Sequence, residues 1–347
     1  MSLWIEKYRP RTLSGIVGQD AAVRVGTRFL ESGSIPNLLL WGPRGVGKFS
    51  FARALALELH GDLENFISLD ASNIFEIGKK YLAEERRFRL FYEERASVID
   101  TFKRIIREFT ALAPINADFK IIFFSNAEAL TLDAQHALRR TMERYSKTCR
   151  FVFSTTKPAK IIMPLRSRCL MLHFRKLSDE HVESIVRRVA SGERLKLSAD
   201  ALRLIKARAD GNAFVAISLL QAAAALSAAP AGGERQYVSG DAVRLAIEKS
   251  YGADAAEIEA LLSHALEGKH EALRKKFRSL LDNRGVSCRE LLECLQDAVK
   301  RRAAAGRIPV EKATHILLKI SDVDARLCEC LNAEIHVEEA LASFSAL

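Results

Sequence analysis

The chain has 347 residues, more than one ordinary hydrophobic core holds, and this length predicts two or three domains. Apolar residues make up 48% of it and charged residues 28%, a composition that excludes an intrinsically disordered protein. Lys and Arg number 53 against 43 Asp and Glu, so the formal net charge of +10 favours an anionic partner, although merely basic proteins share this excess.

The N-terminus and the cysteines indicate a protein of the cell interior. Residues 1–7, Met-Ser-Leu-Trp-Ile-Glu-Lys, hold no apolar core of a secretory signal. A run of about 18 apolar residues, which a membrane-spanning helix needs, does not occur. Of six scattered cysteines, Cys328 and Cys330 form the one close pair, and no second pair completes a metal-finger spacing. We therefore expect a reduced chain without a metal site, cytoplasmic or, if its source is eukaryotic, nuclear.

In residues 1–175 short apolar runs alternate with helical patterns, which is typical of a parallel sheet with crossover helices. The runs are apolar on both faces, as strands covered by helices on each side require. We expect these strands at 38–41, 120–124, 151–154 and 170–173, and helices at 98–109 and 132–145.

From residue 177 onward the strand pattern disappears, and helices are expected in two groups. The first group lies within 176–250 and includes an Ala-, Pro- and Gly-rich connector at 224–233. The second group covers 251–347, with heptad-like apolar spacing at 258–266 and 316–331. The helices of the first group are predicted at 179–190, 199–209, 213–225 and 240–249.

Residues 42–48, Gly-Pro-Arg-Gly-Val-Gly-Lys, match the G-x-x-x-x-G-K core of a phosphate-binding loop between a predicted strand and a predicted helix. Its glycines let backbone N–H groups surround an anion, the helix N-terminus adds a positive dipole, and Lys48 adds a cation. We predict that the loop binds ATP or ADP; the alternative is an inherited loop that stays empty. The candidate residues are Gly42, Pro43, Arg44, Gly45, Val46, Gly47, Lys48, Phe49 and Ser50.

The residues expected to hold Mg²⁺ depart from this motif. A Ser or Thr hydroxyl should follow the lysine, but Phe49 stands there, and Ser50 is rotated from that position by about 100° around the helix. An acidic pair should end the strand at 120–124, but it ends in Ser125 and Asn126. Glu128, farther along, is expected to be a solvent-facing carboxylate. The sequence therefore argues against a Mg²⁺ ligand set at this site.

Several segments in the correct order resemble the replication factor C small subunits, the AAA+ clamp loaders of archaea and eukaryotes. The resemblance implies a hetero-pentamer that uses ATP to open a sliding clamp and load it at primer–template DNA in replication. It also implies an α/β AAA+ phosphate-loop domain with a parallel sheet at 1–175, a helical lid at 176–250 and an all-α collar at 251–347. The matching segments are Trp-Ile-Glu-Lys-Tyr-Arg-Pro at 4–10, Val-Gly-Gln at 17–19, the phosphate loop, residues 130–143, the Ser-Arg-Cys box in 161–169, and residues 324–326 with 332–334.

The resemblance also assigns roles to single residues. Tyr8, Arg9 and Val17 are expected to contact adenine, and Arg168 matches an arginine finger that reaches the neighbouring subunit's nucleotide; the alternative for Arg168 is an ion-paired surface residue. The family's sensor Asn falls on Thr156 and its lid Arg on Phe214. Since the metal ligand and the strand-end acids are altered as well, we expect negligible turnover at this site.

Two helices carry basic residues that could contact DNA. Lys103, Arg104 and Arg107 share one face of the first helix. The resemblance implies that such helices follow the DNA backbone, whereas an ordinary solvated face is the alternative. Segment 74–90, rich in aromatic and basic residues, is longer than in typical small subunits; it could face the clamp or a partner, or be only a longer helix. The second basic helix contributes Arg139, Arg140 and Arg144.

The leading hypothesis is thus a clamp-loader subunit that binds nucleotide, does not hydrolyse it and donates an arginine finger. Its partners are the other clamp-loader subunits, the sliding clamp and primer–template DNA, with no membrane. One alternative is an active AAA+ ATPase, such as a DNA-remodelling motor with unusual metal ligands. Another is a scaffold with an empty nucleotide pocket. Steady-state ATPase activity of the isolated chain distinguishes the first two.

Overall fold

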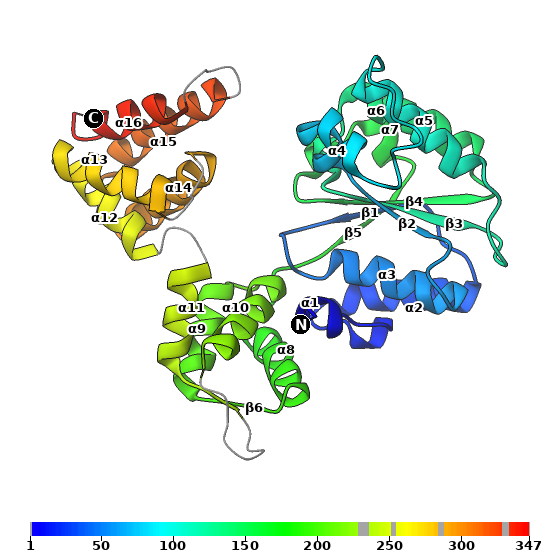
Figure 1. Cartoon of the computed structure of the whole chain (residues 1–347), viewed down its shortest axis with the longest axis horizontal. Coiled ribbons are helices and arrows are strands. Elements are labelled where there is room, and N and C mark those ends of the chain that lie inside the picture. Colours follow the sequence, from blue (N-terminus) through cyan, green and yellow to red (C-terminus); the bar gives the residue numbers. More distant parts are fainter. Residues whose placement is uncertain (1, 228–235, 251–254, 284–287, 328–332, 347) are drawn as a thin grey trace. The chain divides into compact units, whose positions relative to one another are not determined.

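The computed structural model describes residues 2–227, 236–250, 255–283, 288–327 and 333–346 (Figure 1). By its internal contacts the chain divides into two compact units, 1–240 and 241–347. Most of the predicted connector, Cys328, Cys330 and Asn332 lie outside the described residues. The domain boundaries after residues 175 and 250 stay predictions. In the described part of the chain no helix is both long enough and apolar enough to cross a membrane.

A five-stranded parallel sheet forms the centre of the first unit, in the order β2-β3-β4-β1-β5. The predicted parallel α/β fold is confirmed, and four of the strands were predicted. The sequence analysis missed β2, an edge strand in which Leu69 alone is fully buried, so that no continuous apolar run marks it. The strands are β1 (Leu38–Trp41), β2 (Phe66–Asp70), β3 (Lys120–Ser125), β4 (Cys149–Thr155) and β5 (Leu170–His173).

Helices cover both faces of this sheet, as Figure 1 shows. α2 (Asp20–Ser32) and α3 (Lys48–His60) lie on one face, and α5 (Val98–Ala111) and α6 (Leu132–Arg144) lie on the other. Successive strand residues point to opposite faces, so each strand contributes to two apolar layers. Leu38, Leu40, Phe123 and Val152 pack toward α2 and α3, whereas Leu39, Phe124, Phe151 and Phe153 pack toward α5 and α6.

Segment 74–90 adds an aromatic layer beside α5 and is not a single longer helix. It contains most of a π-helical turn, η2 (Asn73–Ile77), and α4 (Lys79–Glu84). The Phe75 ring centroid lies 5.1 Å from that of Phe102, and that of Phe88, which is fully buried, lies 6.4 Å from Phe109. Of the aromatic residues that could have faced a partner, Phe88 is therefore part of the core, whereas Phe75, Tyr81 and Phe91 are partly buried and pack against it. Lys79, Lys80, Arg86, Arg87 and Arg89 are exposed.

The rest of the first unit holds short N-terminal turns and a helical part. The helical part contains a two-stranded parallel sheet, β6 (Leu195–Leu197) with β7 (Gln236–Val238), which contradicts the expectation of helices alone. Three residues per strand are too few for a recognisable alternation. The elements are α1 (Trp4–Lys7), η1 (Leu13–Gly15), η3 (Ala127–Ala129), η4 (Pro158–Lys160), α7 (Met163–Arg166), α8 (Asp179–Gly192), α9 (Ala199–Ala209) and α10 (Ala213–Leu226).

The second unit is helical in its described residues, as predicted. Its apolar core includes Leu261, Phe277, Leu295, Ile316 and Phe344. The helices are α11 (Gly240–Ser250), α12 (Ala255–Leu266), α13 (His270–Arg278), the π-helical η5 (Ser279–Asn283), α14 (Cys288–Ala304), α15 (Val310–Arg326) and α16 (Ala333–Ser343).

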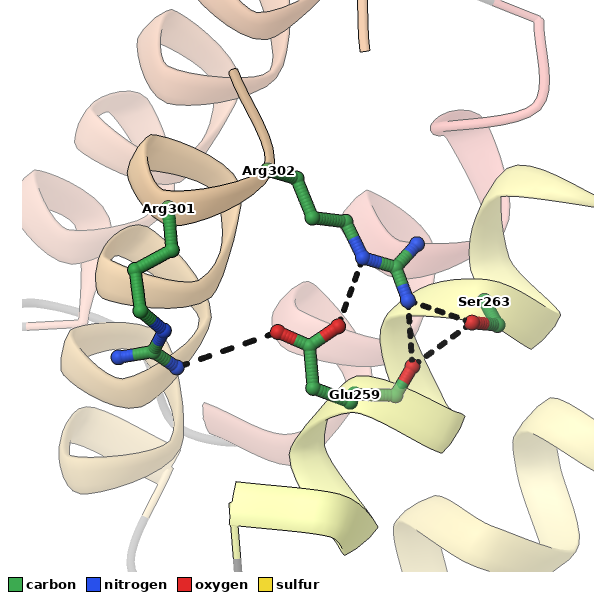
Figure 2. Close-up of polar contacts among 4 residues, drawn as sticks. All are labelled: Glu259, Ser263, Arg301 and Arg302. Atoms are coloured by element: carbon green, nitrogen blue, oxygen red, sulfur yellow. Dashed lines mark hydrogen bonds and ion pairs between the residues drawn. The ribbon is translucent and has the colours of Figure 1, made fainter. Parts of the chain in front are cut away.

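A polar network joins α12 to α14 in this unit (Figure 2). Arg302 donates from Nε to Glu259 Oε2 at 2.7 Å, and from Nη2 to the Glu259 carbonyl at 3.1 Å and to Ser263 Oγ at 2.6 Å. Arg301 is more exposed and lies 4.0 Å from Glu259 Oε1. Arg302 is thus the cation that carries this junction, because its three bonds are largely shielded from water.

We expect Arg302→Ala to lower the local stability of α12 and α14 by about 1–3 kcal/mol, because the half-buried Glu259 carboxylate loses its partner. Native-state hydrogen exchange of amides in both helices measures this loss without assuming two-state unfolding of the chain. Arg301→Ala is the matched control, with an expected change below about 0.5 kcal/mol. Equal losses in the two variants would contradict the assignment.

Candidate functional site

A cavity of about 400 Å³ opens in the first unit where β1, β3 and β4 end. The phosphate loop, the N-terminal residues, the strand ends and α8 and α10 all contribute to its wall. Gly42 and Pro43 lie outside the wall. The predicted nucleotide-binding residues that line it are Tyr8, Arg9, Val17, Arg44, Gly45, Val46, Gly47, Lys48, Phe49 and Ser50.

The loop's own carbonyls hold its lysine. Lys48 is the first residue of α3 and is 8% exposed. Its Nζ donates to the carbonyls of Gly42 at 2.7 Å and Pro43 at 2.5 Å, so these two residues act through the lysine. Gly42 admits no side chain, since a Cβ would stand 2.0 Å from the Phe174 carbonyl oxygen. The loop therefore presents a preformed cationic cradle to an anion.

Burial controls the protonation of this lysine. It lowers the pKa of Lys48 to about 8, with Glu128 opposing the change and Arg44 adding to it. Glu128 was expected to face solvent, but it is half-buried and accepts from Thr156 Oγ1 at 2.7 Å. Burial alone would raise the pKa of Glu128; hydrogen bonds from Thr155 and Thr156 outweigh it and lower that pKa. The expectation failed because the partner threonines lie on and just after a different strand, β4.

The residues present do not fit Mg²⁺. The Phe49 ring, at the position of the expected hydroxyl, packs 5.2 Å from the Phe123 ring between centroids. Ser125 Oγ and Asn126 Nδ2 both donate to Asp70 Oδ2, at 2.7 and 3.0 Å. Among the residues that the structure describes, no group of three or more His, Cys, Asp or Glu could hold a metal ion. Asp70 is an acid that the sequence analysis did not connect to this site, because it ends the missed strand β2.

The first residue of α10 touches the phosphate loop. The backbone N–H of Ala213 donates to the Gly45 carbonyl at 3.0 Å, and a Cβ at Gly45 would stand 1.7 Å from Asn212 Oδ1. Phe214 lines the cavity and is 52% exposed. Arg188 of α8 also lines it and donates to the Gly15 carbonyl at 3.2 Å. No sequence motif includes Arg188, so its place in the cavity wall could be found only from the tertiary structure.

Family comparisons agree with this architecture. Residues 38–176 match the model of the ATPase family associated with various cellular activities, and residues 253–343 match the replication factor C C-terminal domain. The replication factor C small subunit of Methanothermobacter thermautotrophicus is 34% identical over 345 residues, covering 98% of this chain and 97% of the relative. That of Archaeoglobus fulgidus is 34% identical and covers 99% and 98%. The chain belongs to the replication factor C small-subunit family.

The likeness to solved structures shows only the fold of this family member. The RuvB Holliday-junction branch-migration motor of Thermotoga maritima superimposes with a TM-score of 0.54 at 20% identity, covering 75% of this chain and 80% of that one. At that identity the likeness carries no argument about activity. The predicted replication factor C resemblance is confirmed, as is the AAA+ domain followed by a helical domain.

Arg168, the predicted finger of this replication factor C family member, lies away from its own cavity. Its Nε and Nη2 donate to Glu143 Oε1 of α6 at 3.0 and 2.5 Å, and its Nη1 donates to the Pro164 carbonyl at 2.8 Å. The side chains of Arg168 and Glu143 are 37% and 50% exposed. A pair so exposed is weak, so the guanidinium can exchange Glu143 for another anion at little cost.

Members of both predicted basic clusters of this replication factor C family member meet in one groove, although Arg139 does not line it. Lys103 and Arg107 of α5 line a hollow of about 410 Å³ together with Arg140 and Arg144 of α6. Arg104 is absent from this wall; its guanidinium pairs with Glu93 and donates to the Phe91 carbonyl. The three predicted cations nevertheless share one face, because Lys103, Arg104 and Arg107 together line a second hollow of about 270 Å³. Within it, Arg104 is the one whose guanidinium Glu93 and the Phe91 carbonyl hold.

Proposed function

We propose that the chain is a subunit of a clamp loader that places a sliding clamp on primed DNA during replication. We further propose that it binds ATP or ADP in the cavity and does not hydrolyse it. The observation that best supports this proposal is that one cavity is lined by the phosphate loop, the N-terminal residues and the helices α8 and α10. The chain that holds this cavity belongs to the replication factor C small-subunit family.

Nucleotide binding is supported by the chemistry of the wall. Lys48, Arg44 and the first turn of α3 supply the positive charge that a polyphosphate requires. Tyr8 and Val17, with apolar neighbours such as Ile16 and Ile217, suit the face of an adenine ring.

Loss of hydrolysis is supported by the residues that would position water and metal. Phe49 offers no hydroxyl, and Ser125 and Asn126 are neutral and bonded to Asp70. Glu128, the nearest acid along the chain, is bonded to Thr156. Phosphoryl transfer depends on exact placement of charge and water, and no described residue of the wall supplies an activating carboxylate.

A trans role for Arg168 is supported by its place on the surface and by its arginine fork. Its own cavity does not include it, so any nucleotide that it reaches belongs to another subunit. The proposed partners are accordingly the other subunits of a hetero-pentamer, besides the sliding clamp and primer–template DNA.

Reconstitution tests this function. The full chain is mixed with the subunits that co-purify with it, and retention of a sliding clamp on circular primed DNA is measured. Loading is expected with the chain and is expected to disappear when it is omitted. Equal loading without the chain would contradict the clamp-loader proposal.

The lysine predicts a pH dependence of binding. In the free protein the pKa of Lys48 is about 8, and bound phosphates favour its protonated form. Above this pH, binding must first restore the proton, so the affinity for ADP is expected to fall about tenfold between pH 7 and pH 9. Isothermal titration in buffers of different ionisation enthalpy measures both affinity and proton uptake. Lys48→Arg keeps its charge at these pH values, so its affinity for ADP should not fall in this way. If the affinity of this variant fell with pH as steeply as that of the parent chain, the role of Lys48 would be contradicted.

The basic groove predicts a salt effect on DNA binding. In the assembled complex, Lys103→Ala with Arg107→Ala is expected to lower the magnitude of the log–log salt slope by about 1.8, or 0.9 for each lost phosphate contact. The loss should be the same for every DNA sequence, because phosphate contacts carry no base readout. Arg104→Ala is the matched control, since Glu93 and the Phe91 carbonyl already hold its guanidinium. An unchanged salt slope in the double variant would mean that the groove is an ordinary solvated surface that does not contact DNA.

A further inference from the structure

We propose that the cavity selects a nucleoside polyphosphate that carries no Mg²⁺, so that Mg²⁺ competes with the protein for the nucleotide instead of assisting its binding. This inference rests on the proposed nucleotide-binding function. Its basis is the charge of the wall, which carries the four cationic side chains of Arg9, Arg44, Lys48 and Arg188. No described residue of the wall is Asp or Glu.

Two carboxylates that contact wall residues, those of Asp70 and Glu128, are engaged by hydrogen bonds. Asp70 accepts the Ser125 and Asn126 side chains through Oδ2 and the backbone N–H of Asn73 through Oδ1, at 3.1 Å. Glu128 lies near enough to Lys48 to influence its pKa, but its oxygens accept bonds from the backbone N–H and hydroxyl of Thr156. The described wall therefore offers hydroxyl and amide oxygens but no carboxylate to hold the water shell of a hydrated Mg²⁺, which carboxylates ordinarily do.

Arg9 supplies a fixed cation close to the expected metal-ligand position. Its guanidinium lies 4.6 Å from the centroid of the Phe49 ring, and its Nη1 donates to Ser50 Oγ at 3.2 Å. Glu6, which lies outside the wall, holds the same guanidinium. The Arg9 side chain is only 13% exposed, so its charge is held against the first turn of α3. Arginine is suited to this task because its planar fork can stack on a ring and still donate.

The charge balance decides which form of the nucleotide binds. A di- or triphosphate without metal brings its full negative charge to four cations, of which Arg9 is already paired with the Glu6 carboxylate, whereas bound Mg²⁺ cancels two of the nucleotide's charges. Phe49 closes the other route, because its ring packs 5.2 Å from Phe123 and 6.1 Å from Phe66 between centroids and offers no oxygen to the metal. Mg²⁺ thus weakens the attraction between the nucleotide and this site, and the described wall offers it no anionic ligand in exchange.

Titration of the full chain with ADP tests the inference. Affinity is measured in EDTA and in Mg²⁺ in excess over nucleotide, with ionic strength matched by KCl. The apparent Kd for total ADP is expected to be at least about tenfold higher with Mg²⁺. An equal or lower Kd with Mg²⁺ would overturn the inference. Absence of binding in both buffers would instead overturn nucleotide binding itself.

Two charge variants test the part played by Arg9. Arg9→Gln is expected to weaken the binding of metal-free ADP about tenfold and to reduce the Mg²⁺ penalty, which is the ratio of the Kd measured with Mg²⁺ to the Kd measured in EDTA. Arg9→Lys should restore part of the affinity and part of this ratio. Arg11→Gln removes the same charge from an exposed residue outside the wall and should change neither. Equal effects at residues 9 and 11 would overturn the assignment.

An exchange of two side chains tests the missing carboxylate at constant net charge. Asp70→Asn combined with Asn126→Asp moves the acid into the wall and keeps a hydrogen-bonded pair. The Mg²⁺ penalty is expected to fall several-fold, because the metal regains an anionic neighbour. A penalty identical to that of the parent chain, in a variant with an unchanged circular dichroism spectrum, would overturn the explanation.

Discussion

Replacing Arg168 by Ala is expected to reduce ATP hydrolysis at one neighbouring site of the assembled complex by about 10³-fold or more, within the range of arginine fingers. An arginine finger stabilises charge that develops on the γ-phosphate with a delocalised, forked cation, and this is the role proposed for Arg168. Lys lacks the fork, so Arg168→Lys should lose less than Ala but still most of the rate. Single-turnover hydrolysis in complexes in which only that neighbour's site is competent measures the effect.

Assembly and nucleotide binding by the chain should survive this change. Among the described residues, the Arg168 guanidinium bonds to the exposed Glu143 and to the Pro164 carbonyl, so we expect its removal to leave the core contacts unchanged. Arg187→Ala is a matched control, since Arg187 is likewise an exposed arginine in an ion pair, with Glu183. A complex with Arg168→Ala that assembles and hydrolyses at the parent rate would make Arg168 a structural residue.

The isolated chain is expected to bind ADP or ATP and yet to turn over at least about 10³-fold more slowly than a typical enzyme at ~10 s⁻¹. The reason is the joint change of the hydroxyl position, the strand-end acids and the lid arginine, each of which is worth orders of magnitude in phosphoryl transfer. Phosphate release with protein in excess over labelled ATP gives the rate.

Lys48→Ala separates true turnover from a contaminating ATPase. Loss of Lys48 removes a buried cation from the loop and should weaken nucleotide binding about tenfold to a hundredfold. Lys160→Ala, an exposed lysine outside the cavity, is the control for a lost charge. A rate of ~1 s⁻¹ or more that vanishes in Lys48→Ala would favour the alternative of an active AAA+ motor with unusual ligands.

Features with a strong local signature could be predicted from the sequence. Residues 42–48 fold as a phosphate loop because glycines and the following helix define its conformation over a few consecutive residues. The central strands β1, β3 and β4 could be predicted because burial on both faces makes them continuously apolar. The lack of the expected metal-binding hydroxyl at Phe49 could also be predicted, because the identity of that one residue is enough to show it.

The tertiary structure decided what depends on contacts between distant residues. Asp70 meets Ser125 from 55 positions away, because parallel strands β2 and β3 end at the same edge of the sheet. Arg168 pairs with Glu143 across 25 positions, so an exposed pair could not be told from a free finger by pattern alone. The composition of the cavity wall is likewise decided by the tertiary structure. Arg9 and Arg188 are distant in sequence from the phosphate loop, and they line the same cavity only because the segments that carry them, next to α1 and in α8, pack around it. Local patterns specify elements, whereas the charge that a ligand meets is a sum over all the elements that converge on it.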